Sequence, residues 1–180
     1  DSFGSRLVDL DDIEGIRAMT GREILSSLGI SLFRLPFLGK KMHPFVRKGL
    51  EDVVPFDGMK MVLDRLVAGG AQCGVISSNH EDNIYRVLDR WGWDMMAFVQ
   101  GGARAFGKHR YIQRLSKDLG VGLDRMVYVG DEDRDIQCAK KAGVQVVAVS
   151  WGFQNRQVLE LFGPDCIVDT SDQLLEVLYG

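Results

Sequence analysis

The feature that most constrains this chain is a regular alternation of short apolar runs with amphipathic segments from about Val53 onward. The apolar runs cover residues 72–77, 97–100, 126–130 and 144–150, with a weaker fifth at 166–168. They are continuously apolar, as strands buried on both faces of a parallel sheet are. Apolar residues recur at helical spacing over 59–68, 82–91, 109–119, 133–142, 156–162 and 174–178. This alternation predicts an α/β fold with a doubly wound parallel, Rossmann-like sheet.

The first fifty residues have a different character. They contain no strand-like run, and they predict helices over residues 11–28 and 38–49, with Gly15 and Gly21 as weak points in the first. We therefore expect a small N-terminal helical cap domain at 4–53 and an α/β core domain at 54–180. Residues 54–56 would form the hinge between them.

Composition excludes several classes of protein. A net charge of −3 without a basic stripe argues against a nucleic-acid partner. No apolar run reaches the roughly 18–20 residues that a membrane-spanning helix needs, so we expect no membrane association. The three cysteines are widely spaced in apolar contexts, which predicts buried reduced thiols in a cytoplasmic protein rather than disulfides or a zinc site. Nothing in the sequence indicates the oligomeric state.

The first predicted strand ends in Ser77-Ser78-Asn79. Ligands of open parallel sheets bind at the carboxyl ends of the strands, where the N-termini of the following helices also point. The Ser77 hydroxyl, with Ser78, Asn79 and the backbone N–H groups of the turn, could therefore hold phosphate oxygens. The alternative is that Ser78 or Asn79 only caps the next helix.

Four acidic residues follow the strand predicted at 126–130: Asp131, Glu132, Asp133 and Asp135. Carboxylates crowded together repel one another, which favours a divalent cation, and hard oxygen ligands suit Mg²⁺. One or two acids at a helix N-terminus need no such explanation, because the helix dipole favours them. We therefore assign metal binding to Asp131, with support from Asp135, and expect Glu132 and Asp133 to be solvated.

Lys108 stands just before a predicted helix. A lysine in that place could neutralise a phosphate and hold the acidic cluster together. The alternative is a solvated surface lysine, the commonest situation for this residue. His80 and His109 flank these loops, and we expect them to be capping or surface groups without a catalytic role.

Taken in order, a strand ending at Ser77, a helix-start lysine at Lys108, and Gly130-Asp131 followed by Asp135 resemble the haloacid-dehalogenase (HAD) superfamily. The stretch from Asp135 to Phe153 resembles its phosphoglycolate phosphatase-like branch, and the likeness covers essentially the whole chain. The resemblance implies a HAD core with a cap, acting as a Mg²⁺-dependent phosphatase on a small phosphate monoester through an aspartyl-phosphate.

In that scheme Ser77 and Lys108 hold the non-bridging phosphate oxygens, and Asp131 shares the metal with the nucleophilic aspartate. The cap would exclude water and select the substrate. Within the cap, Arg22 is the candidate for an anionic leaving group and Arg17 the second choice. The alternative is that both are surface arginines.

The start of the chain departs from the family pattern. The first motif of the family is a strand ending in Asp-x-Asp-Gly-Thr, commonly followed by Asp-Ser-Phe, and this sequence begins with Asp1-Ser2-Phe3. We therefore expect the first core strand, with its nucleophile and acid/base aspartates, to lie upstream of residue 1, and the 180-residue chain alone to be inactive. The stretch at 9–12 (DLDD) only imitates the motif, because Gly-Thr is lacking.

Other functions stay open. The chain could be a non-catalytic HAD-like binding or regulatory protein, or a sugar-phosphate mutase of the same superfamily. A dehalogenase is disfavoured by the retained Asp131 and Asp135. A receiver-like signalling domain is disfavoured because such domains carry their acidic cluster on early strands. No GxGxxG follows a strand, so a dinucleotide site is poorly supported.

Overall fold

The structure of the protein is a computed structural model that describes residues 12–31, 46–102 and 107–179. Five strands are described: β1 (Gly74–Ile76), β2 (Phe98–Gln100), β3 (Val127–Gly130), β4 (Gln145–Val149) and β5 (Cys166–Val168). The core helices are α4 (Met59–Ala68), α5 (Glu81–Arg90), α6 (Lys108–Leu119), α7 (Asp133–Ala142), α8 (Arg156–Leu161) and α9 (Ser171–Tyr179). Two 3₁₀ turns, η2 (Leu50–Asp52) and η3 (Leu123–Arg125), and the N-terminal helices α1 (Ile13–Arg17) and α2 (Gly21–Ser27) complete the described elements.

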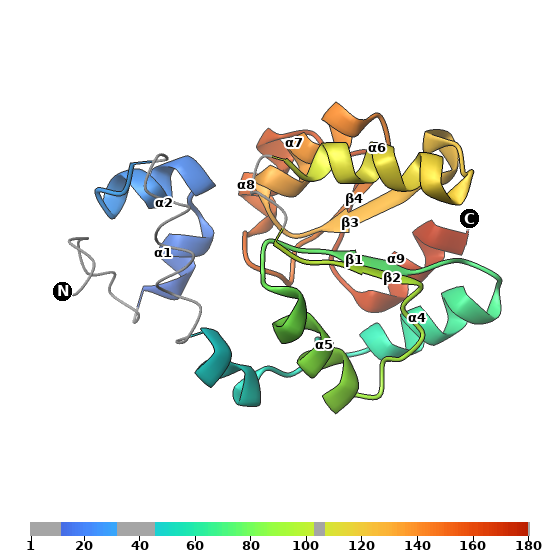
Figure 1. Ribbon diagram of the computed structural model, residues 1–180. Coiled ribbons are helices and arrows are strands. Elements are labelled where there is room, and N and C mark those ends of the chain that lie inside the picture. The colour runs from blue at the N-terminus through green and yellow to red at the C-terminus, as the bar shows by residue number, and fades with distance from the viewer. Residues whose placement is uncertain (1–11, 32–45, 103–106, 180) are drawn as a thin grey trace.

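Every strand pairing in the described residues is parallel, as predicted. The strands form two sheets, β1-β2 and β3-β4-β5, with β1 and β3 as the facing edges (Figure 1). From this boundary the chain builds outward in both directions, which is the doubly wound pattern. The boundary is therefore the switch point of the fold, and ligands of such sheets bind outside the strand ends at this point.

Helices cover both faces of the three-stranded sheet. The side chains of β4 alternate between two cores: Val146 and Ala148 pack with α6, α7 and α8, while Val147 and Val149 pack with α4 and α9. β3 is less well covered, because Val127 and Val129 are 43% and 39% exposed. The sheet is therefore best packed at β4 and more open toward the switch point.

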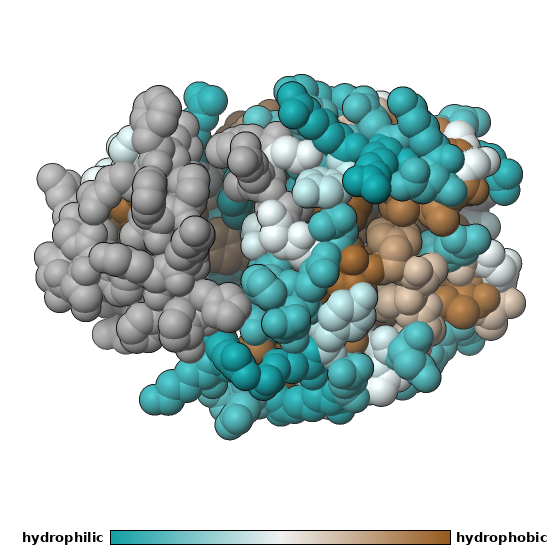
Figure 2. All heavy atoms as spheres, in the orientation of Figure 1, coloured by the Kyte–Doolittle hydropathy of each residue, from teal (hydrophilic) through white to brown (hydrophobic). Residues whose placement is uncertain are grey.

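In the two-stranded sheet, β2 is the edge that faces away from β3. Apolar side chains show on the surface between α6 and the β1–β2 pair (Figure 2). A small hollow of about 160 Å³ lies there, lined in part by Ile76, Phe98 and Leu115. The β1–β2 pair is thus only partly buried.

Residues 12–31, called the cap segment below, lie beside the carboxyl ends of the strands (Figure 1). This segment is helical, but the single helix predicted over 11–28 is two short helices. The break falls at Thr20, whose hydroxyl accepts from the Glu23 N–H while the Glu23 carboxylate accepts from the Thr20 N–H. This reciprocal capping box starts a new helix. The helix predicted over 38–49 lies largely outside the described residues.

The remaining sequence predictions agree with the fold except at their ends. α4 and α7 have the predicted bounds, whereas β1 is three residues long rather than six and the last helix extends over nine residues. All three cysteines are free; only Cys138 is fully buried, while Cys73 and Cys166 are half-buried. Among the described residues, none of the helices combines the length and apolar character of a membrane span.

Candidate active site

The turn after β1 is built by side chains that satisfy its own backbone. The Asn79 N–H donates to Ser77 Oγ over 3.1 Å, and Asn79 Oδ1 accepts from the His80 N–H and from the buried Asn83 side chain. His80, not Ser78 or Asn79, is the N-cap of α5. The capping role expected for His80 is thus confirmed, and Asn79 stabilises the turn that presents Ser77.

Lys108 is the first residue of α6, and it is not a solvated surface lysine. Its ammonium donates to Asp135 Oδ1 over 2.6 Å and to the Tyr128 hydroxyl over 3.3 Å, and the Tyr128 hydroxyl donates to the same carboxylate oxygen over 3.2 Å. The Lys108 and Asp135 side chains are 14% and 8% exposed. Lys108 therefore binds the acidic segment, as expected, and burial together with Asp135 raises the pKa of Tyr128.

Asp131 follows the last residue of β3 and faces the loop after β4. Its Oδ2 accepts from the Phe153 N–H over 2.7 Å, and its backbone carbonyl accepts from the Gln154 N–H over 3.1 Å. Gly152 makes this approach possible, because a Cβ there would lie 2.2 Å from the Asp131 Cβ. The carboxylate is thus held in one orientation at the switch point.

The prediction that Glu132 and Asp133 are solvated is wrong for Asp133 and only partly right for Glu132, whose side chain is 25% exposed. Asp133 is 3% exposed, and its carboxylate accepts from the Gly21 N–H of the cap segment and from the Arg134 N–H. The Glu132 carboxylate is paired with the Arg134 guanidinium, and burial raises its pKa. A distant backbone N–H therefore replaces water at Asp133, whereas Glu132 is paired with a neighbour in the same turn.

Each of the four acids therefore accepts a hydrogen bond from a donor within the protein. The described residues contain no group of three or more His, Cys, Asp or Glu side chains suited to a metal. Crowding of four acids is thus a weaker argument for a cation than the sequence suggested. Asp131 and Asp135 remain the two candidate ligands.

These two carboxylates fit Mg²⁺. Burial raises the pKa of Asp131, and the charge of Asp135 adds to that rise, whereas the Phe153 N–H and Lys108 oppose it. A cation beside Asp131 would relieve the first two effects. Mg²⁺ usually takes only one or two protein carboxylates and completes its shell with water and phosphate oxygens, so a two-carboxylate set is sufficient.

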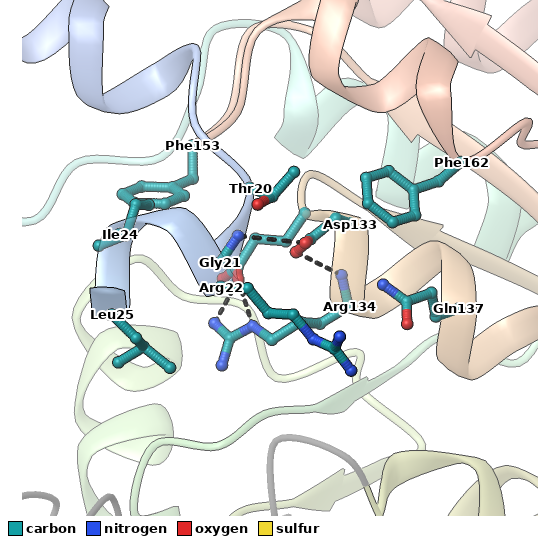
Figure 3. A pocket seen from close by; sticks show the side chains of 11 residues that line it. Thr20, Gly21, Arg22, Ile24, Leu25, Asp133, Arg134, Gln137, Phe153 and Phe162 are labelled. Atoms are coloured by element: carbon teal, nitrogen blue, oxygen red, sulfur yellow. Dashed lines mark hydrogen bonds and ion pairs between the residues drawn. The ribbon is translucent and has the colours of Figure 1, made fainter. Parts of the chain in front are cut away.

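The two candidate arginines of the cap segment lie in different surroundings. Arg17 contacts the core, where its guanidinium donates to the Ser150 and Phe153 carbonyls over 3.0 and 3.3 Å. Arg22 points into a cavity of about 390 Å³ between α2 and the start of α7 (Figure 3). Neither Ser77 nor Lys108 is among the residues that line this cavity. The structure therefore brings Lys108, Asp131 and Asp135 together but places Arg22 apart from them.

Three participants were not predicted from the sequence. Tyr128 was assigned only to a strand, Phe153 acts through its backbone N–H, and Gln154 is a single amide in a loop. The glycine pair formed by Gly130 and Gly152 is the one signal that could have indicated close packing here, since a Cβ on Gly130 would lie 2.5 Å from the Asp135 Cβ.

The fold and these side chains define a Rossmann-like α/β protein with a buried lysine–carboxylate centre at the switch point of a parallel sheet. The chain belongs to the haloacid dehalogenase-like hydrolase family, whose pattern matches residues 1–149. It is 32% identical to the phosphoglycolate phosphatase of Synechococcus elongatus over 98% of this chain and 84% of that protein. The family and branch that the motifs resemble are thereby confirmed.

Solved structures agree on the fold. A candidate phosphoglycolate phosphatase from Lactobacillus delbrueckii is 29% identical, with a TM-score of 0.61 over 69% of this chain and 53% of that one. The chain thus spans about half the length of that protein. A predicted phosphatase from Clostridium acetobutylicum (18% identity, TM-score 0.78, 97% and 83% covered) and a candidate β-phosphoglucomutase from Thermotoga maritima (17%, 0.66, 99% and 86%) share the fold alone.

Proposed function

We propose that this protein is a Mg²⁺-dependent phosphatase of small phosphate monoesters, working through an aspartyl-phosphate. The observation that carries the proposal is the buried Lys108–Asp135 pair beside Asp131 at the switch point. A largely buried lysine with two carboxylates suits a dianionic ester with its cation better than a neutral or apolar substrate. The similarity to phosphoglycolate phosphatases supports the same reaction class.

In this proposal Asp131 and Asp135 would hold Mg²⁺, and the bound cation would offset the repulsion between carboxylate and phosphate. The Lys108 ammonium would balance charge on the phosphate and hold the Asp135 carboxylate in its orientation. Ser77, whose Oγ accepts a hydrogen bond from the Asn79 N–H, would donate a hydrogen bond from its hydroxyl to a phosphate oxygen. A carboxylate oxygen of the nucleophilic aspartate would bond to phosphorus as the ester P–O bond breaks, and the second aspartate of the family's first motif would give its proton to the leaving alkoxide. Water, losing a proton to that second aspartate, would then attack the acyl phosphate and release inorganic phosphate.

The nucleophile of this reaction is the aspartate of the family's first motif. We place it on a strand between β1 and β3, for which the facing edges of the two sheets provide a site. A parallel strand there would end between Ser77 and Asp131, as a nucleophile requires.

The three free thiols support a reducing compartment such as the cytoplasm.

The test is a phosphatase assay on the full-length protein with an aryl phosphate and with phosphoglycolate, in Mg²⁺ and in chelator. Asp131→Asn and Lys108→Met should each reduce kcat by at least about a hundredfold. Asp118→Asn, at an exposed ion pair on α6, is the control and should have no effect. Turnover in the presence of chelator would reject the metal assignment.

Two further outcomes separate the alternatives. Transfer of phosphate between positions of a sugar phosphate without net release would indicate a mutase. Metal and phosphate binding without any turnover of the full-length protein would indicate a binding or regulatory member of the family.

A further inference from the structure

Gln154 is a buried amide that the proposed reaction does not use. Its side chain is 0% exposed and lies in the loop between β4 and α8. Its Nε2 donates to the Met19 carbonyl of the cap segment over 2.9 Å, and its Oε1 accepts from the Asp133 N–H at the start of α7. Its own backbone N–H donates to the Asp131 carbonyl. One residue thus joins the cap segment, the first turn of α7 and the end of β3.

Other contacts between the cap segment and the core converge on the same place. The Arg17 guanidinium donates to the Ser150 and Phe153 carbonyls, and the Asn155 N–H donates to the Arg17 carbonyl over 3.0 Å. The Gly21 N–H donates to the Asp133 carboxylate, as Figure 3 shows. Residues 17–21 therefore bind the loop at 150–155 and Asp133, two positions after Asp131.

The same loop fixes the Asp131 side chain. The Phe153 N–H donates to Asp131 Oδ2, and Gly152 lies against the Asp131 Cβ without room for a side chain. A displacement of this loop would break the hydrogen bond from the Phe153 N–H to that carboxylate. The position of the cap segment and the orientation of Asp131 consequently depend on one short piece of backbone.

We propose that Gln154 is a positioning residue that couples docking of the cap segment at 17–21 to the orientation of the Asp131 carboxylate. When the cap segment is docked, the loop holds Asp131 in its observed orientation; when the segment leaves, the loop is released and the Asp131–Phe153 hydrogen bond weakens. Coupling of this kind is reciprocal. If docking of the cap segment favours the observed orientation of Asp131 by a given factor, that orientation favours docking by the same factor.

The coupling can be measured without substrate or metal. Amide hydrogen exchange by NMR reports cap docking at Gly21, whose N–H donates across the interface to Asp133, and the Asp131 contact at Phe153, whose N–H donates to the Asp131 carboxylate within the core. In Gln154→Met both amides should exchange at least about tenfold faster, the expected effect of losing a buried hydrogen bond. Gln157→Met, at an exposed position of α8, is the matched control and should leave both amides unchanged.

The reciprocal arm is Asp131→Ala. Loss of the carboxylate removes the acceptor of the Phe153 N–H, and we expect faster exchange at Gly21 although no contact of Gly21 is touched. If Gln154→Met does not fold, Gln154→Glu replaces it; that variant keeps the acceptor for the Asp133 N–H and loses the donor to Met19. Unchanged exchange at Gly21 in Asp131→Ala would overturn the proposal, as would faster exchange at Gly21 alone in the Gln154 variant.

The functional meaning of the coupling rests on the proposed role of Asp131. In the full-length enzyme, Gln154→Met should raise the Mg²⁺ concentration needed for half-maximal activity by about tenfold, whereas a residue with only a structural role would lower the amount of active protein and leave that concentration unchanged. The exchange arms do not need turnover. A protein without phosphatase activity but with coupled exchange would reject the proposed function and retain this inference.

Discussion

The Lys108–Asp135 pair allows a quantitative test of how the site is held together. Lys108→Met keeps the length of the side chain and removes its charge. The Asp135 side chain, 8% exposed, then keeps the hydrogen bond from the Tyr128 hydroxyl but loses its ion-pair partner. Removing one partner of a buried ion pair costs about 3–5 kcal/mol. Because Tyr128 still donates and the Lys108 side chain is itself 14% exposed, we expect the lower part of that range, about 3–4 kcal/mol of unfolding free energy.

The assay is urea unfolding of the wild-type protein, Lys108→Met, Asp135→Asn and the double variant. Asp135→Asn should cost less, about 1–2 kcal/mol, since the long lysine side chain can turn its ammonium toward water. The double variant should be more stable than the sum of the single effects implies, by about 1–3 kcal/mol. Additive effects, or a loss below about 1 kcal/mol in Lys108→Met as for an exposed pair, would refute the buried ion pair.

Three further outcomes are expected. Gly152→Ala should destabilise the protein by about 1–3 kcal/mol in thermal unfolding, because its Cβ would overlap the Asp131 side chain, whereas Gly49→Ala, with open space around it, should change little. The raised pKa of Asp131 means that its stability contribution is present below the ordinary carboxyl pKa and is lost as pH rises through the raised value. In chelator, Asp131→Asn should therefore be more stable than the wild type near pH 7, by on the order of 1 kcal/mol, and should lose this advantage in acid. Thermal melts at each pH measure the difference, and added Mg²⁺ should stabilise only the wild type. Leu159→Ala in the core should cost about 2–5 kcal/mol in urea, and Leu161→Ala on the same helix, 77% exposed, under about 0.5 kcal/mol; equal losses would contradict the assigned face of α8.

The sequence was most informative where local signals determine structure. α4 ends before Gly69 and α7 before Gly143, the stops that helical spacing and glycine placement indicate, so both helices were predicted with their bounds. The cap helix was predicted too long because the capping box at Thr20 and Glu23 was not recognised as a second start. Strand ends were overextended, because an apolar run does not show where pairing with a neighbour stops.

The candidate site was predictable only in part. Lys108 and the acids stand next to predicted strand and helix ends, which made them candidates. The Asp133 carboxylate accepts a hydrogen bond from Gly21, 112 positions away along the chain, and no local sequence pattern can predict such a contact. Gln154 was missed for the same reason, since a lone amide in a loop has no periodicity or motif to mark it.

The separation of β1-β2 from β3-β4-β5 also bears on how the molecule comes apart. Val146, Val147 and Ala148 at the centre of the larger sheet are fully enclosed by two helical layers, whereas each residue of β1 and β2 retains contact with solvent. The half that carries the Ser77 turn should open frequently while the half that carries Asp131 stays closed. A protease given limited time would then cut between β1 and α6 and leave a resistant C-terminal fragment, in which β4 keeps the longest-lived amide protons of the chain.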